Sequence, residues 1–125
     1  DSCIQTRAYL ERNCGEIAGS GISALFVCSY ATAREALAFL ERRGIDVPDR
    51  LSLLSYGFDS IPDETPRISS VDSPLPKQAA AVLDIIDRQL CGDLASPCQI
   101  SIKPEILEYK SVADINLKPG KAAVS

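Results

Sequence analysis

The sequence predicts an α/β fold built around a parallel sheet, and three consecutive segments carry this prediction. Residues 22–28 form a short, mostly apolar run without alternation, which is typical of a strand buried on both faces. A helical pattern follows over 31–43, where Ala33, Ala36, Leu37 and Leu40 share one face. A second apolar run occupies 51–56. Strand, helix and strand in this order predict two parallel strands joined by a right-handed crossover.

The rest of the chain divides into helices and short strands separated by turn residues. In order, we predict a helix over 6–18, a loop over 60–66, a strand over 67–71, a helix over 77–90, strand-like pieces over 98–102 and 105–109, and a tail over 116–125. The helix over 77–90 begins just after Pro76, as helices often do, and the piece over 105–109 alternates like an edge strand.

Composition limits the possible functions. The chain has 125 residues, enough for one domain with a modest core, and a net charge of -4. This acidity argues against direct binding of nucleic acid, because phosphate contacts need a basic face. No apolar run approaches the roughly 20 residues that span a bilayer. The absence of Met suggests that the sequence is a piece of a longer chain.

The absence of histidine and the pattern of the cysteines narrow the chemistry further. Without histidine, Ser-His and Cys-His catalysis is excluded within this sequence, and a zinc site is disfavoured. The five cysteines show no C-x-x-C spacing, which predicts free, mostly buried thiols in a reducing compartment.

Candidate ligand contacts lie where strands pass into the following segment, because open parallel sheets bind ligands there. Ser29 and Tyr30 follow the first strand. They fit either a helix N-cap with a half-buried ring, or a ligand contact in which the hydroxyl bonds and the ring stacks. Gly57-Phe58-Asp59 follows the second strand and fits either a tight turn or a second contact.

Several motifs together resemble a known family. They are the linker Gly44-Ile45-Asp46-Val47-Pro48-Asp49-Arg50-Leu51-Ser52, the strand end Ser55-Tyr56-Gly57-Phe58-Asp59, the segment Pro66-Arg67-Ile68-Ser69-Ser70-Val71-Asp72-Ser73-Pro74 and the closing Ile106-Leu107-Glu108-Tyr109-Lys110-Ser111. Their order resembles the C-terminal part of the effector-binding domain of LacI/GalR-type bacterial transcription regulators. The resemblance covers about residues 5–113, and the linker is its most specific part.

The resemblance implies a three-layer parallel-sheet sandwich over residues 1–115, the C-terminal subdomain of a periplasmic-binding-protein-like type I fold. It implies a tail over 116–125 and a crossover helix over 76–91 that packs on an N-terminal subdomain. It also places the DNA-reading helix-turn-helix outside this sequence. With the N-terminal subdomain outside as well, the crossover helix is expected to find another partner, such as its symmetry mate.

The resemblance also implies site residues. Ligand contacts are expected at Ser29, Tyr30, Gly57, Asp59 and Ser73, and a dimer interface at Arg34, Ala38, Ile61, Pro62 and Pro66. The family usually has Asn-Asp where this chain has Ser29-Tyr30, and an Asp where it has Gly57. A carboxylate is the group that usually accepts hydrogen bonds from two neighbouring hydroxyls of a sugar. Either the ligand differs, therefore, or the cleft has lost its effector.

Three functions are compatible with these features. The first is an effector-sensing and dimerisation domain of a cytoplasmic LacI/GalR-like transcription regulator or repressor. It would bind a sugar or nucleoside, form a homodimer, reach DNA only through a head outside this sequence, and use no cofactor, metal or membrane. The alternative is a periplasmic sugar-binding protein of a transporter, which the odd cysteine count disfavours. An α/β enzyme is disfavoured by the lack of histidine, a phosphate loop and a nucleophile elbow.

Overall fold

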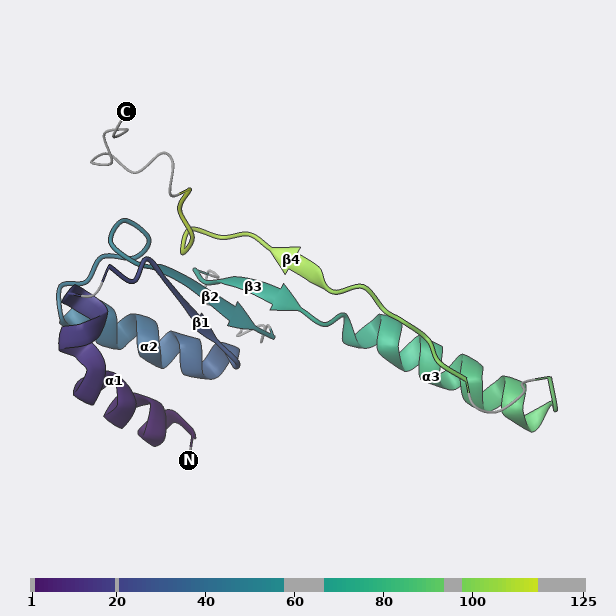
Figure 1. Ribbon diagram of the computed structural model, residues 1–125. Helices are drawn as coiled ribbons and strands as arrows, with labels where there is room; N and C mark the ends of the chain where they lie inside the picture. Colours follow the sequence, from purple (N-terminus) through teal and green to yellow (C-terminus); the bar gives the residue numbers. More distant parts are fainter. Residues whose placement is uncertain (1, 20, 58–66, 94–97, 115–125) are drawn as a thin grey trace.

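Four strands form one sheet with the order β1-β2-β3-β4 (Figure 1). The computed structural model describes residues 2–19, 21–57, 67–93 and 98–114. The strands are β1 (Ala24–Val27), β2 (Ser52–Tyr56), β3 (Ser69–Asp72) and β4 (Glu105–Leu107). β1, β2 and β3 are parallel, and β4 runs antiparallel to β3. The α/β class and the parallel pairing of the first two strands are therefore confirmed.

The core lies between this sheet and the helix α2 (Tyr30–Arg42), which packs on β1 and β2. The predicted stripe is confirmed, since Ala33, Ala36 and Leu40 of α2 are completely buried. They meet Leu51 and Leu53, which are also completely buried. The helix ends at Arg42 with Arg43 as its C-cap. Gly44 follows with a φ of 70°, a conformation that glycine adopts without the steric cost of a Cβ.

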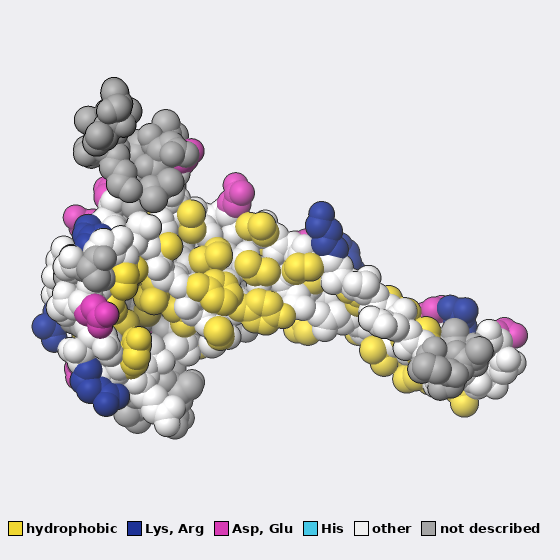
Figure 2. All heavy atoms as spheres, viewed as in Figure 1, with side chains coloured by type: hydrophobic (Ala, Val, Ile, Leu, Met, Phe, Trp, Pro, Cys, Tyr) yellow, Lys and Arg dark blue, Asp and Glu magenta, His cyan; other side chains and the backbone are white. Residues whose placement is uncertain are grey.

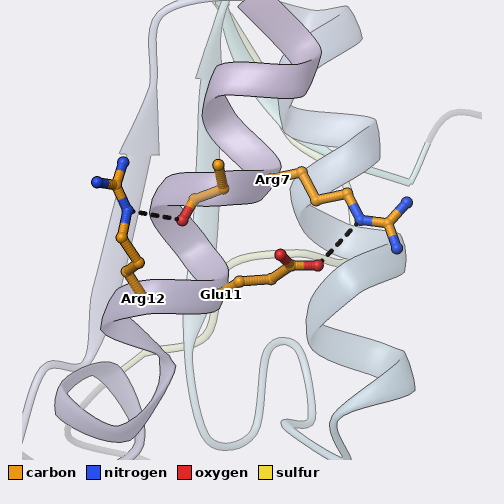
Figure 3. A network of polar contacts seen from close by, with 4 residues as sticks. Arg7, Glu11 and Arg12 are labelled. Carbon is orange, nitrogen blue, oxygen red and sulfur yellow. Dashed lines mark hydrogen bonds and ion pairs between the residues drawn. The ribbon is translucent and has the colours of Figure 1, made fainter.

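The helix α1 (Ser2–Gly19) packs on α2 on the same side of the sheet (Figure 1). Leu10 and Ile17 bring it into the core cluster. Its opposite face is polar: Arg7 Nε donates to Glu11 Oε1 at 3.2 Å, and Arg12 Nε donates to the Ala8 carbonyl at 3.1 Å (Figure 3). These contacts are exposed, so they add little stability and mainly keep this face in water.

The sheet face turned away from α1 and α2 is open in the described residues. Figure 2 shows apolar side chains gathered over the sheet. The prediction that residues 22–28 are buried on both faces is therefore wrong, because Phe26 of β1 is 53% exposed. Burial of a strand on two faces requires layers on both sides, and among the described residues the helices supply one.

The described cysteine side chains also differ from the prediction. Cys28, Cys91 and Cys98 are free thiols, as expected. They are not buried, however, since Cys28 and Cys91 are exposed and Cys98 is half-buried. Cys28 follows β1 and Cys91 follows α3 directly, so neither lies in the core. Composition alone therefore overstated the burial of these thiols.

The helix α3 (Leu75–Leu90) projects beyond the sheet like an arm (Figure 1). It confirms the predicted helix and starts two residues earlier, with Pro76 in its first turn. None of its residues is buried. After it, residues 98–102 do not form the expected strand, and the pairing is limited to the three residues of β4. β4 is an edge strand in the described sheet, as its alternation predicted.

Buried serines join the sheet to the segment after β4. Ser111 Oγ donates to the Leu53 carbonyl at 2.6 Å and accepts from the Ser69 amide at 2.7 Å. Ser55 and Ser70 share a hydroxyl–hydroxyl bond of 2.7 Å between β2 and β3. No buried side-chain polar atom among the described residues lacks a partner. The hydroxyls therefore fix the register of these segments without leaving unsatisfied groups.

We predict that Ser111→Ala destabilises the chain by about 2 kcal/mol, because the buried Ser69 amide and Leu53 carbonyl would lose their partner. Urea denaturation followed by circular dichroism measures this loss. Ser101→Ala, which removes an exposed hydroxyl, is the control and is expected to be neutral within about 0.5 kcal/mol. Equal effects of the two substitutions would contradict the structural role of Ser111.

Candidate functional site

The carboxyl ends of β1, β2 and β3 lie side by side at one edge of the sheet. Val27 pairs with Ser55, and Tyr56 pairs with Val71. Continuing these registers places Ser29 beside Gly57, with Ser73 beyond the neighbouring strand. Adjacent strands lie about 4.8 Å apart. Three of the five predicted contacts, Ser29, Gly57 and Ser73, therefore follow the three parallel strands at this edge.

Ser29 occupies the N-cap position of α2, which agrees with the helix N-cap interpretation of this residue. Its backbone is extended, with φ -156° and ψ 135°, and its carbonyl accepts from the Ala33 amide at 2.9 Å. Its side chain makes no capping hydrogen bond. Ser29 is half-buried and lines a hollow of about 450 Å³ together with Thr6, Tyr9 and Thr32. Gly57 and Ser73 do not line this hollow.

Tyr30 points into the core. It is 6% exposed and packs with Ala33, Leu37, Leu53 and Ile68. Its position at the first turn of α2, three residues before Ala33, extends the buried stripe of the helix. This packing does not favour stacking of the ring on a sugar, so the ligand role of Tyr30 stays a prediction that the packing does not support.

Gly57 and Ser73 are each held by a hydrogen bond. Gly57 has φ 78°, and its amide donates to the Val71 carbonyl at 2.9 Å. Ser73 Oγ accepts a hydrogen bond from Gln78 Nε2 of α3. Asp59 lies outside the described residues. Ser73 therefore connects the carboxyl edge to the first turn of α3.

Asp72 is a candidate contact that the sequence analysis did not select. It is the last residue of β3 and is half-buried. The strand registers place it beside Gly57 at the same edge. The signal was present in the sequence, since an acid followed the predicted strand directly. The resemblance placed the family's carboxylate at the Gly57 position, with Asp59 two residues later, and so did not point to Asp72.

The expected dimer interface is described in part. Arg34 and Ala38 are half-buried residues of α2. Ile61, Pro62 and Pro66 lie outside the described residues. The interface stays a prediction.

Metal and membrane features can be considered for the described residues. No group of three or more His, Cys, Asp or Glu side chains in them is arranged to hold a metal ion. None of the described helices combines the length and apolar character needed to cross a membrane. The carboxyl edge offers hydroxyl, carboxylate and backbone groups, which suit hydrogen bonding to a small polar molecule.

An open, mainly parallel sheet with polar groups at its carboxyl edge defines the class of α/β domains that bind small molecules at that edge. The match to a family model makes the assignment more specific. The chain belongs to the family described as periplasmic binding protein-like domain, whose model matches residues 6–112. The family inferred from the sequence motifs is thereby confirmed.

Solved structures of transcription regulators share this fold. The regulator CcpA of Lactococcus lactis superposes with a TM-score of 0.71 at 21% identity, covering 89% of this chain and 40% of that one. The regulator CelR in complex with cellobiose gives 0.69 at 18% identity, covering 87% and 32%. A sugar-binding LacI-family regulator from Escherichia coli, complexed with phosphate, gives 0.65 at 25% identity, covering 86% and 36%.

These three structures are all those of transcription regulators. The chain spans about a third to two fifths of the length of these structures. A search of curated proteins finds no match.

We predict that Gly57→Ala destabilises the chain by about 1 kcal/mol, because its positive φ is unfavourable for a residue with a Cβ. A Cβ at Gly57 would meet no atom within 4 Å, so conformation rather than a clash sets the cost. Gly15→Ala is the matched control: it has equal space but lies within α1, and should stabilise by about 0.5–1 kcal/mol. Thermal unfolding of both variants tests these opposite signs.

Proposed function

We propose that this chain is part of the effector-binding domain of a LacI-family transcription regulator and that it contacts a small molecule at the carboxyl edge of β1, β2 and β3. The observation that carries this proposal is the convergence of Ser29, Gly57 and Asp72 at the edge where open parallel sheets bind ligands. The regulator structures of the same fold support it.

The chemistry of the edge favours a neutral, hydroxyl-rich effector. The Ser29 hydroxyl can donate and accept, and a carboxylate such as Asp72 accepts from two neighbouring hydroxyls. Asp72 would accept the hydrogen bonds that the family's usual acid at the Gly57 position accepts. Similar regulators were solved with cellobiose and with sucrose. Another was solved with phosphate, but Asp72 and the net charge of -4 oppose an anion here.

The mechanism would be a shift between two populations of domain arrangements. The effector binds one arrangement more tightly, and this difference in affinity sets how far the equilibrium can move. A homodimer would then transmit the selected arrangement to DNA-binding heads in a longer regulator. Such a protein acts in the cytoplasm, where its operator DNA is found.

We predict that a disaccharide screen by thermal shift finds an effector whose affinity falls about fivefold in Ser29→Ala, because one hydrogen bond contributes about 1 kcal/mol. The matched control is Ser23→Ala, a half-buried serine just before the other end of β1. It should leave the affinity unchanged. Asp72→Asn should weaken binding more, since its hydrogen bonds involve a charged group.

Titration calorimetry of the best sugar then measures each dissociation constant. Equal losses in Ser29→Ala and Ser23→Ala would move the site away from the carboxyl edge. A screen in which folded wild-type chain shows no shift with any sugar, nucleoside or sugar phosphate would contradict effector sensing by this chain.

A further inference from the structure

A second hollow lies beside the linker that follows α2, on the side of the sheet that the helices cover. Its volume is about 980 Å³, which is near the upper end of the roughly 300–1,000 Å³ that small-molecule sites occupy. We call it the linker hollow. The lining residues that matter for its chemistry are Leu37, Val47, Pro48, Arg67, Tyr109 and Lys110.

The linker hollow is separate from the carboxyl edge. Arg67 precedes β3, which starts at Ser69, whereas Asp72 is the last residue of that strand. The hollow and the carboxyl edge therefore lie toward opposite ends of β3. Ser29 and Gly57 do not line the hollow. A molecule bound in it would leave the place of the proposed effector free, so its binding does not depend on the sensing function.

One wall of the linker hollow is apolar and belongs to the core. Leu37 is 7% exposed and packs with Leu53 and Ile68. Val47 and Pro48 of the linker are half-buried, and Val47 packs against both core clusters. The packing that holds α2 on the sheet therefore also holds this wall in place. The wall offers a fixed apolar surface to a hydrocarbon or aromatic group.

Two cations line the polar wall of the linker hollow. Arg67 and Lys110 are both exposed to solvent there. Arg67 Nη2 donates to Glu41 Oε1 of α2. Because a guanidinium carries several N–H donors, this bond orients the Arg67 side chain and leaves donors for an anion. Lys110 makes no ion pair within the described part of the chain.

The acids near the hollow do not cancel this positive charge. Glu41 is engaged by Arg67 and does not line the hollow. Glu108 lines it, but Glu108 also lines a neighbouring hollow that Arg67 and Lys110 do not reach. Two cations therefore stand against one acid at the polar wall, although the whole chain has a net charge of -4.

Hydrogen bonds on both sides of Lys110 fix the backbone that carries it. Ser69 Oγ donates to the Tyr109 carbonyl at 3.0 Å and accepts from the Tyr109 amide at 2.9 Å. On the other side, Ser111 is buried, and its Oγ donates to the Leu53 carbonyl at 2.6 Å. Lys110 thus lies between two anchored residues. A preorganised wall of this kind lowers the entropic cost of binding a ligand.

We propose that the linker hollow binds an amphipathic organic anion. The anionic head accepts hydrogen bonds from the Arg67 guanidinium and the Lys110 ammonium, while the apolar body packs on the wall formed by Leu37, Val47 and Pro48. Carboxylates and phosphate esters share this chemistry, because both accept charge-assisted hydrogen bonds from such cations. A neutral sugar, as proposed for the carboxyl edge, has neither the charge nor the apolar body.

The first experiment is a nuclear magnetic resonance titration of the 125-residue chain with 3-phenylpropionate and with benzyl phosphate, which distinguishes the two kinds of head. Their neutral counterparts, 3-phenylpropionamide and benzyl alcohol, keep the apolar body and lose the charge. We expect at least one anion to shift the amide signals of Lys110 and Ser111 in a saturable way. It should bind at least about fivefold more tightly than its neutral counterpart, because charge-assisted hydrogen bonds are roughly twice as strong as neutral ones.

The second experiment removes one cation without touching the core. We expect Lys110→Gln to weaken binding of the anion by about fivefold and to leave binding of the neutral counterpart unchanged. Lys103→Gln is the matched control, because Lys103 is also exposed but does not line the hollow. It should leave both affinities unchanged. Circular dichroism checks that both variants fold.

Intermolecular nuclear Overhauser effects then locate the apolar body. We expect contacts from the aromatic protons of the ligand to the methyl groups of Leu37 and Val47. Contacts to Phe26 of the open sheet face instead would overturn the proposal. Equal losses of affinity in Lys110→Gln and Lys103→Gln would overturn it as well. So would equally tight binding of the neutral counterparts, or a folded chain whose signals neither anion shifts at millimolar concentration.

Discussion

The packing of α2 against β1 and β2 is the interaction on which the rest of the structure depends. Leu40, Leu51 and Leu53 are fully buried there, and each such side chain contributes about 1.5–3 kcal/mol through the hydrophobic effect. This packing holds β1 and β2 parallel and places the first turn of α2 at the carboxyl end of β1. The position of Ser29 at the ligand edge is therefore a consequence of core packing.

β3 and the segment after β4 are held by polar contacts to a greater degree than β1 and β2 are. Ser69 exchanges two hydrogen bonds with the backbone of Tyr109, at 2.9 and 3.0 Å. Ser111 and Ser52 attach the following residues to β2. Hydroxyls define register more sharply than apolar side chains do, because a shifted strand would leave each buried group unsatisfied. β3 therefore presents Asp72 and Ser73 at a fixed position beside Gly57.

Local periodicity was sufficient to predict α2, β2 and α3, because each has a strong apolar pattern. Core packing satisfies the pattern of α2 and β2, whereas no residue of α3 is buried. The exposure of Phe26 could not be read from the run 22–28, since it depends on which layers cover the sheet. The full burial of Tyr30 could be predicted from the sequence, because Tyr30, Ala33 and Leu37 follow helical spacing. The family resemblance instead implied a ligand role for the ring. Asp72 was missed for the same reason, as Asp59 stood closer to the family pattern.

The carboxyl edge and α3 are joined by the two residues Ser73 and Pro74. Ser73 bonds to Gln78 in the first turn of α3, so a ligand that engages Ser73 would compete for that hydroxyl. A small change of direction at the link becomes a larger displacement at the far end of a helix about 24 Å long. A molecule bound at the carboxyl edge would therefore have a direct physical route to the surface on which α3 packs. The route runs through one hydrogen bond and a short link. Coupling of this kind acts in both directions, so the packing of α3 would alter the affinity at the edge as much as a bound molecule alters that packing.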